Sequence, residues 1–241
     1  MRASHSANAP ASVSAPDNPR SFDHLAEEHD FVATLERTPA FFLANLPPQR
    51  RRVLDVGCGT GLLAHELSRH FAAVVAIDIS EPMLAIARAK RSAPNIEYRR
   101  EDANHLALHQ EFDFIVSHSA FHHLDNIPET LRVLKSALQP GGRLALVDNA
   151  ARFPMIPRHS GILIANALVK LPLDLLRHDR PAVWRLFRFR TSRPWLDHVK
   201  GDTILSRARF REVYGRCLPG ASFVPLNHFM GVVWQAPASR E

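Results

Sequence analysis

A glycine-rich break in an apolar run constrains the fold of this chain more than any other feature. Residues 53–56 (VLDV) lead into Gly57, Gly59 and Gly61, and an apolar segment continues over residues 62–67. This pattern is typical of a buried strand, a tight turn and a helix. Because glycine tolerates a positive φ and carries no side chain, a ligand can approach the backbone of such a turn closely. The sequence therefore predicts a site in which a ligand lies on backbone amides.

The spacing of these glycines disfavours a nicotinamide cofactor. The dinucleotide fingerprint G-x-G-x-x-G requires glycine at a position where this chain has Leu62. Two acids follow, since Asp78 closes the apolar run 74–77 and Asp102 follows the strand-like segment 96–98. Ligands in an open α/β sheet bind beyond the carboxyl ends of its strands, so both acids are expected to face the crevice beside the turn. The two oxygens of Asp78 suit a ribose diol, which predicts a nucleoside ligand.

Five motifs, taken in order, resemble those of a known family. They are VLDVGCGTG (53–61), IDIS (77–80), EDA (101–103), FDFIVSHSAFHHL (112–124) and LQPGGRLALVD (138–148). The set is similar to that of class I S-adenosylmethionine-dependent methyltransferases of the small-molecule type, over roughly residues 50–149. The resemblance implies an α/β fold with a doubly wound, seven-stranded, mostly parallel Rossmann-like sheet and an antiparallel last strand. It also implies S-adenosyl-L-methionine as the cofactor.

The resemblance assigns cofactor contacts position by position. The glycine turn would hold the methionine portion, Asp78 the ribose hydroxyls, and Asp102 with Ala103 the adenine edge. Asp55 would set the approach of the first helix or, through water, contact the amino group. For Met83 core packing stays open beside adenine contact, because methionine fills gaps generally. The expected cofactor-binding residues are Asp55, Gly57, Cys58, Gly59, Gly61, Asp78, Ile79, Met83, Asp102, Ala103 and His118.

Three histidines follow the fourth predicted strand, 112–117, where the resemblance places the methyl group to be transferred. An imidazole with its ordinary pKa near ~6.5 can take a proton from an acceptor hydroxyl, so His122 and His123 are the candidate catalytic bases. The competing interpretation is that they cap or pack against the helix expected near Pro128. A metal centre that includes His118 is not expected, because no carboxylate or cysteine of recognised spacing completes a ligand set.

Length and composition predict a single globular domain. The chain has 241 residues, is 46% apolar and carries a net charge of +6, which allows one large core. Residues 1–20, rich in Ala, Ser and Pro, are predicted to be a disordered tail, and residues 21–241 one methyltransferase domain. No run approaches the ~20 apolar residues of a membrane span. Two cysteines, Cys58 and Cys217, make no disulfide framework, which favours a reducing cytoplasm.

Two segments extend the minimal fold. Residues 21–48 are predicted to form two short helices, broken at Thr38-Pro39, that act as a lid or cover a sheet edge. Residues 150–200 are longer than a plain crossover, so they are predicted to form a helical cap insertion, with an apolar helix interrupted at Pro172.

Arginine and aromatic residues alternate in the second half of this insertion, from Arg177 to Trp195. A cap over an aromatic or anionic small molecule, a solvated face, and contact with nucleic acid or a membrane all fit this pattern. No recognised RNA-binding module accompanies it, which disfavours nucleic acid as a partner.

The sequence thus predicts an S-adenosylmethionine-dependent methyltransferase of a small-molecule acceptor, in secondary metabolism or on a quinone-like ring. Such an enzyme aligns an oxygen, nitrogen or carbon nucleophile with the methyl group and excludes water. A regulator or a non-methylating enzyme that binds the same cofactor is the alternative, and an RNA methyltransferase is disfavoured. The acceptor atom and the oligomeric state stay open.

Overall fold

The computed structural model describes residues 25–35, 39–151, 160–200 and 204–238. The predicted disordered tail, 1–20, lies outside these ranges. The described strands are β1 (Arg52–Val56), β2 (Ala73–Asp78), β3 (Ile96–Arg100), β4 (Phe112–His118), β5 (Leu138–Ala151), β6 (Leu205–Ser206), β7 (Ser222–Leu226) and β8 (Phe229–Gln235). The described helices are α1 (Ala26–Leu35), α2 (Pro39–Leu43), α3 (Leu62–Leu67), α4 (Glu81–Lys90), α5 (Ile127–Ala137), α6 (Ser160–Arg177), α7 (Arg180–Thr191), α8 (Arg193–Lys200) and α9 (Arg207–Cys217).

One sheet organises the molecule, with the strand order β3-β2-β1-β4-β5-β8-β7 and the short β6 beside β5. Strands β1 to β5 pair in parallel, and β8 runs antiparallel to both β5 and β7. Two residues, Asn227 and His228, join β7 to β8, and a connection this short forces antiparallel pairing. The predicted mostly parallel α/β sheet with an antiparallel last strand is confirmed, and the two-residue β6 is an addition to it.

Alternating side chains along each strand supply two cores, one on each face of the sheet. Leu54 and Val56 face the core that the side chains of α5 and α9 complete, whereas Val53 faces the core under α2 and α3. Because helices cover both faces, the central strands are apolar on both sides. This arrangement leaves the ends of the strands as the place where polar groups and a ligand can meet.

Local sequence signals set the start of several helices. The Ser80 hydroxyl accepts a hydrogen bond from the Met83 N–H at 3.3 Å, and Pro82 occupies the first turn of α4. Ser206 caps α9 in the same way, accepting from the Arg209 N–H at 3.2 Å, as its sequence predicts.

Two proline-containing segments differ from their predictions. Residues 140–142 have the composition Pro-Gly-Gly, which favours a turn, but they lie within β5. The Gly141 N–H and the Gly142 carbonyl hydrogen-bond to the C-terminal segment, and the pairing of β5 with β4 shifts register. Helix α6 continues through Pro172 rather than stopping there. The carbonyl of Leu168 loses its helical partner at this proline, but Leu168 is exposed, so water can take that place.

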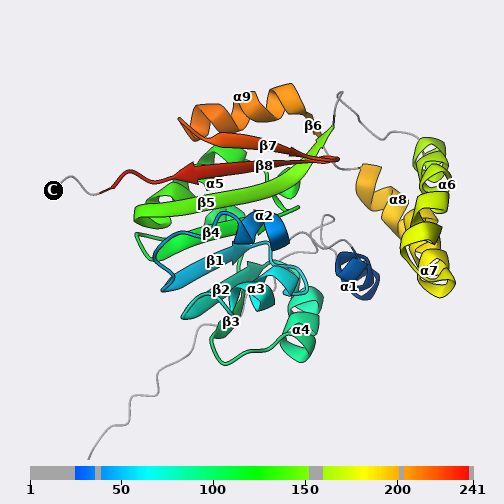
Figure 1. Cartoon of the computed structure of the whole chain (residues 1–241), viewed down its shortest axis with the longest axis horizontal. Helices are drawn as coiled ribbons and strands as arrows, with labels where there is room; N and C mark the ends of the chain where they lie inside the picture. The colour runs from blue at the N-terminus through cyan, green and yellow to red at the C-terminus, as the bar shows by residue number, and fades with distance from the viewer. Residues whose placement is uncertain (1–24, 36–38, 152–159, 201–203, 239–241) are drawn as a thin grey trace, which may run out of the picture.

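Helix α1 and the helices of residues 160–200 lie beyond the carboxyl ends of the parallel strands, whereas α2 packs on a face of the sheet (Figure 1). Helices α6, α7 and α8 form a cap at one end of the sheet, and α1 lies between the cap and the strands (Figure 1). An ion pair of 2.6 Å between Arg190 and Asp174 joins α7 to α6. Arg185 joins α7 to α1, since it pairs with Glu28 at 3.0 Å and its guanidinium lies 4.3 Å from the centre of the Phe31 ring.

Candidate active site

The glycine turn between β1 and α3 has the conformation that its sequence predicts. Gly57, Gly59 and Gly61 have φ values of 68°, 53° and 83°. A Cβ on Gly57 would lie 2.3 Å from the Cβ of Ala120, and one on Gly61 would lie 2.5 Å from the Tyr98 hydroxyl. At Gly59 the nearest atom to such a Cβ is His29 Cε1 at 4.0 Å, an ordinary contact distance, so this position is not crowded. The outer two glycines therefore allow close packing around the turn, and the middle one leaves backbone exposed to a ligand.

A cavity of about 640 Å³ opens over this turn, a size typical of small-molecule sites. It is lined by ten of the eleven predicted cofactor-binding residues and by His123. The exception is Gly61, which packs behind the turn against Tyr98. The ten are Asp55, Gly57, Cys58, Gly59, Asp78, Ile79, Met83, Asp102, Ala103 and His118. The fold thus brings these residues together, while their individual contacts with a cofactor stay predictions.

Two carboxylates, at the ends of β1 and β2, line this cavity and differ in their hydrogen bonding and burial. Asp78 accepts hydrogen bonds from the Gly59 N–H at 2.7 Å and the Ser80 N–H at 2.9 Å, which ties the glycine turn to β2. Asp55 is fully buried, and its burial, together with the charge of Asp78, raises its pKa to about 7. Its Oδ2 has no hydrogen-bond partner among the described residues. A buried, unsatisfied carboxyl oxygen beside a cavity fits a ligand that brings a cationic or donor group.

Asp102 and Met83 each have a structural role as well as a place in the cavity wall. Asp102 caps the short turn 103–105 by accepting from the Asn104 N–H at 2.9 Å. Met83 is 2% exposed and belongs to the packed side of α4 as well as to the cavity lining. Core packing and ligand contact are therefore compatible at position 83.

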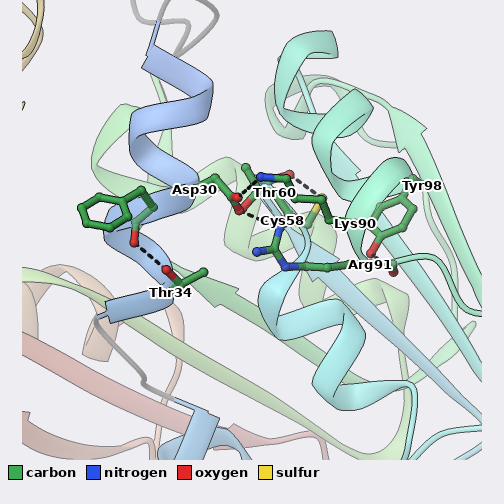
Figure 2. Close-up of polar contacts among 9 residues, drawn as sticks. Asp30, Thr34, Cys58, Thr60, Lys90, Arg91 and Tyr98 are labelled. Carbon is green, nitrogen blue, oxygen red and sulfur yellow. Dashed lines mark hydrogen bonds and ion pairs between the residues drawn. The ribbon is translucent and has the colours of Figure 1, made fainter. Parts of the chain in front are cut away.

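Helix α1 closes one side of the cavity through His29 and through Val32 to Thr34, and the sequence did not point to the last three. Figure 2 shows how α1 is held: Asp30 pairs with Lys90 at 2.7 Å and with Arg91 at 2.6 Å. Arg91 in turn donates to the Thr60 carbonyl of the glycine turn at 2.8 Å. No local motif marks this network, because its members come from three separate segments.

The histidines after β4 have three different environments. His118 lies between Phe42 and Phe229, and burial lowers its pKa to about 4, so it is neutral at pH 7. His123 borders the cavity and packs with its ring centre 3.9 Å from that of His122.

His122 lies behind His123, and its Nδ1 is 2.6 Å from Asp148 Oδ1. Both partners are buried, with side chains 7% and 4% exposed. They line a second cavity of about 460 Å³ with Tyr214. On the cap side, the His198 ring of α8 lies 5.3 Å from that of His123. The pairing of His122 with Asp148 connects positions 26 residues apart and has no sequence signal.

Within the described ranges, no group of three or more His, Cys, Asp or Glu side chains is arranged to hold a metal ion. None of the helices in the described part of the chain has the length and apolar character needed to cross a membrane.

The central part of the chain matches a known protein family. Residues 54–146 match the family model described as a methyltransferase domain. Malonyl-[acyl-carrier protein] O-methyltransferase of Bacillus cereus is 31% identical over 131 residues, covering 51% of this chain and 49% of its own. Ubiquinone biosynthesis O-methyltransferase of Xanthomonas axonopodis pv. citri is 36% identical over 107 residues, covering 43% and 45%. The chain spans about half the length of the curated relatives it matches.

The fold has solved counterparts over nearly the whole chain. A SAM-dependent methyltransferase from Aquifex aeolicus superposes with a TM-score of 0.57 at 20% identity, covering 90% of this chain and 98% of its own. The fold is therefore that of the solved methyltransferase structures, and the glycine turn and Asp78 lie together at the ends of its strands, as the motifs predicted. The match makes segment 54–146 a methyltransferase domain, and this match and the sequence motifs together support S-adenosyl-L-methionine as the cofactor.

Proposed function

We propose that this protein transfers a methyl group from S-adenosyl-L-methionine to an oxygen of a small-molecule acceptor. The observation that carries the proposal is the cavity over the glycine turn, where ten predicted cofactor residues meet. One of them is the buried Asp55, whose Oδ2 has no hydrogen-bond partner among the described residues. The O-methyltransferase names of the Bacillus and Xanthomonas relatives support oxygen as the acceptor atom. Secondary metabolism or quinone-like ring methylation is compatible with both names.

Different residues of the site would contact different parts of the cofactor. The backbone at Gly59 would lie against the methionine portion, and Asp78, already fixed by two backbone N–H groups, would accept from the ribose hydroxyls. Asp55 would receive the cationic amino group, because a positive charge nearby favours ionisation of a carboxyl whose pKa is near 7. When bound, the cofactor supplies a methyl group already activated by its sulfonium. The chain therefore needs to orient the acceptor and exclude water.

His123 is the proposed general base, since it lines the cavity and His122 does not. An acceptor hydroxyl becomes more acidic as its oxygen is methylated, and an imidazole beside it can take the proton. His122 is assigned a positioning role: Asp148 fixes its ring, and that ring packs against His123.

The proposal is tested by calorimetric cofactor binding together with transfer of labelled methyl groups to phenols, quinols and carboxylic acids. H123A is expected to lower kcat by about 10²–10⁴ while the cofactor Kd stays nearly unchanged. H109A is the matched control, because His109 is exposed and lies outside the cavity. Full turnover in H123A would assign the histidine to helix packing. Cofactor binding without turnover on every acceptor would favour a regulator or a non-methylating enzyme.

A further inference from the structure

The outer face of the cap is unusually apolar. Of the eight large hydrophobic side chains exposed in the described residues, seven lie on α6 and α7. They form what we call the outer cap face: Ile162, Leu168, Val169, Leu173, Leu175, Leu176 and Trp184. Val169 is 77% exposed and Leu176 84%. Exposed apolar side chains that are scattered singly over a protein need no explanation. Seven of them gathered on two consecutive helices indicate a binding surface.

Helix α6 is oriented with its apolar side outward. Positions 162, 169, 173 and 176 follow the spacing of one helical face, and all four are exposed. Its charged Asp174 points the other way, where its side chain is 13% exposed and pairs with Arg190. Figure 1 shows α6 at the outer edge of the molecule, on the side of the cap away from the sheet. Burial against the rest of the described chain therefore does not explain why this helix is apolar.

Positive charge is concentrated in the same segment of the chain. Residues 160–200 contain eight Lys and Arg and three Asp, an excess of five charges in a chain whose net charge is +6. Arg177 and Arg180 are exposed at the junction of α6 and α7, and Arg188 is exposed on α7. Trp184 lies beside them, stacked at 6.0 Å on Phe187 and 61% exposed.

We propose that the outer cap face docks on the surface of an anionic lipid bilayer. Aliphatic side chains enter the boundary between headgroups and acyl chains, the indole of Trp184 lies at the interface, and the arginines contact lipid phosphates. A second copy of this chain is the less favourable occupant, because a symmetric contact would bring two positively charged faces together. The face binds the bilayer from one side and does not cross it, in keeping with the absence of a membrane-spanning helix in the described ranges.

Docking of this kind would bring the bilayer near the cavity. Arg185 joins α7 to Glu28 and Phe31 of α1, and α1 supplies part of the cavity wall. The surface is nevertheless separate from the site, because no described residue of 160–200 lines the cavity. Lipid binding can therefore be tested independently of methyl transfer.

The test is co-sedimentation of the full chain with vesicles of phosphatidylcholine, with and without phosphatidylglycerol. Binding is expected with the anionic vesicles and is expected to weaken at high salt. The double variant V169E/L176E should bind at least about tenfold more weakly. V224E is the matched control, since Val224 is the one exposed large hydrophobic residue of the described chain outside the cap.

Three results would overturn the proposal: no binding of the native chain to anionic vesicles, equal binding by V169E/L176E, or a dimer in light scattering that V169E/L176E converts to a monomer. The last result would assign the face to a second copy. Should V169E/L176E fail to fold, Trp184 provides a second measurement. Its fluorescence should shift to the blue on anionic vesicles, and the shift should be absent in W184F. A shift that persists in W184F would also contradict docking through this face.

Discussion

Replacing Asp55 with asparagine tests the electrostatics of the cofactor site directly. The carboxyl is fully buried and its pKa is raised from about 3.8 to about 7, first by burial and then by the charge of Asp78. A folded-state pKa above the unfolded value means that the native protein holds the proton more tightly. The stabilising effect is complete below pH 4 and is lost as the pH rises toward 7 and beyond. D55N keeps the shape of the side chain and removes this titration.

The size of the effect follows from the two pKa values. At about 1.4 kcal/mol for each pKa unit, ionisation of Asp55 costs the native state about 4 kcal/mol at high pH. Between pH 5 and pH 8 the unfolding free energy should fall by about 3 kcal/mol through this group alone. For a chain of this size that corresponds to about 5–10 °C in Tm. D55N should therefore show a flatter profile and be the more stable form at pH 8.

Thermal unfolding of both proteins across this pH range is the assay, with cofactor binding as a second readout. The native affinity should rise as the pH approaches 7, because the amino group of the cofactor binds the ionised carboxylate. D55N should bind weakly at every pH. Parallel Tm profiles for the two proteins would refute the assignment of a raised pKa to Asp55, and equal cofactor affinities would refute its contact with the amino group.

Three further predictions concern the scaffold around the site. G57A should destabilise the protein by about 1–3 kcal/mol or more, measured by urea unfolding, because the new Cβ meets Ala120 at 2.3 Å and the φ of 68° is unfavourable for alanine. D30A should cost about 3 kcal/mol by leaving the buried Arg91 without its carboxylate, and equal unfolding midpoints would contradict this network. E97Q, which removes an exposed carboxylate from its ion pair, should change stability by less than about 1 kcal/mol and serves as the control for D30A.

Local sequence signals account for most of the sheet and for the glycine turn. These signals are the apolar runs, the caps at Ser80 and Ser206, and the two-residue connection after β7. Each depends only on residues close to it in the sequence, so the local structure can be predicted from those residues. The positive φ values of the turn belong to this group, since only glycine adopts them without strain. The errors at residues 140–142 and at Pro172 arose where contacts distant in sequence or access to water outweighed a local preference.

The relative positions of the site residues depend on contacts that no short motif encodes. Asp30 meets Arg91 across 61 positions, and His122 meets Asp148 across 26. Both pairs form only when packing of separate elements buries them together. From the sequence alone His122 and His123 are equal candidates, whereas in the structure His123 lines the cavity and His122 lies behind it.

By itself, the sequence determined the class of fold, the glycine turn and the acids at the strand ends, because strand period, turn chemistry and capping are short-range properties of the chain. Only the tertiary structure decided which oxygen of Asp55 lacks a partner, which histidine reaches the cavity and which side of α6 faces outward. Burial and pairing depend on what other segments bring to the same place, and an apolar helix has the same sequence whether a core covers it or solvent surrounds it.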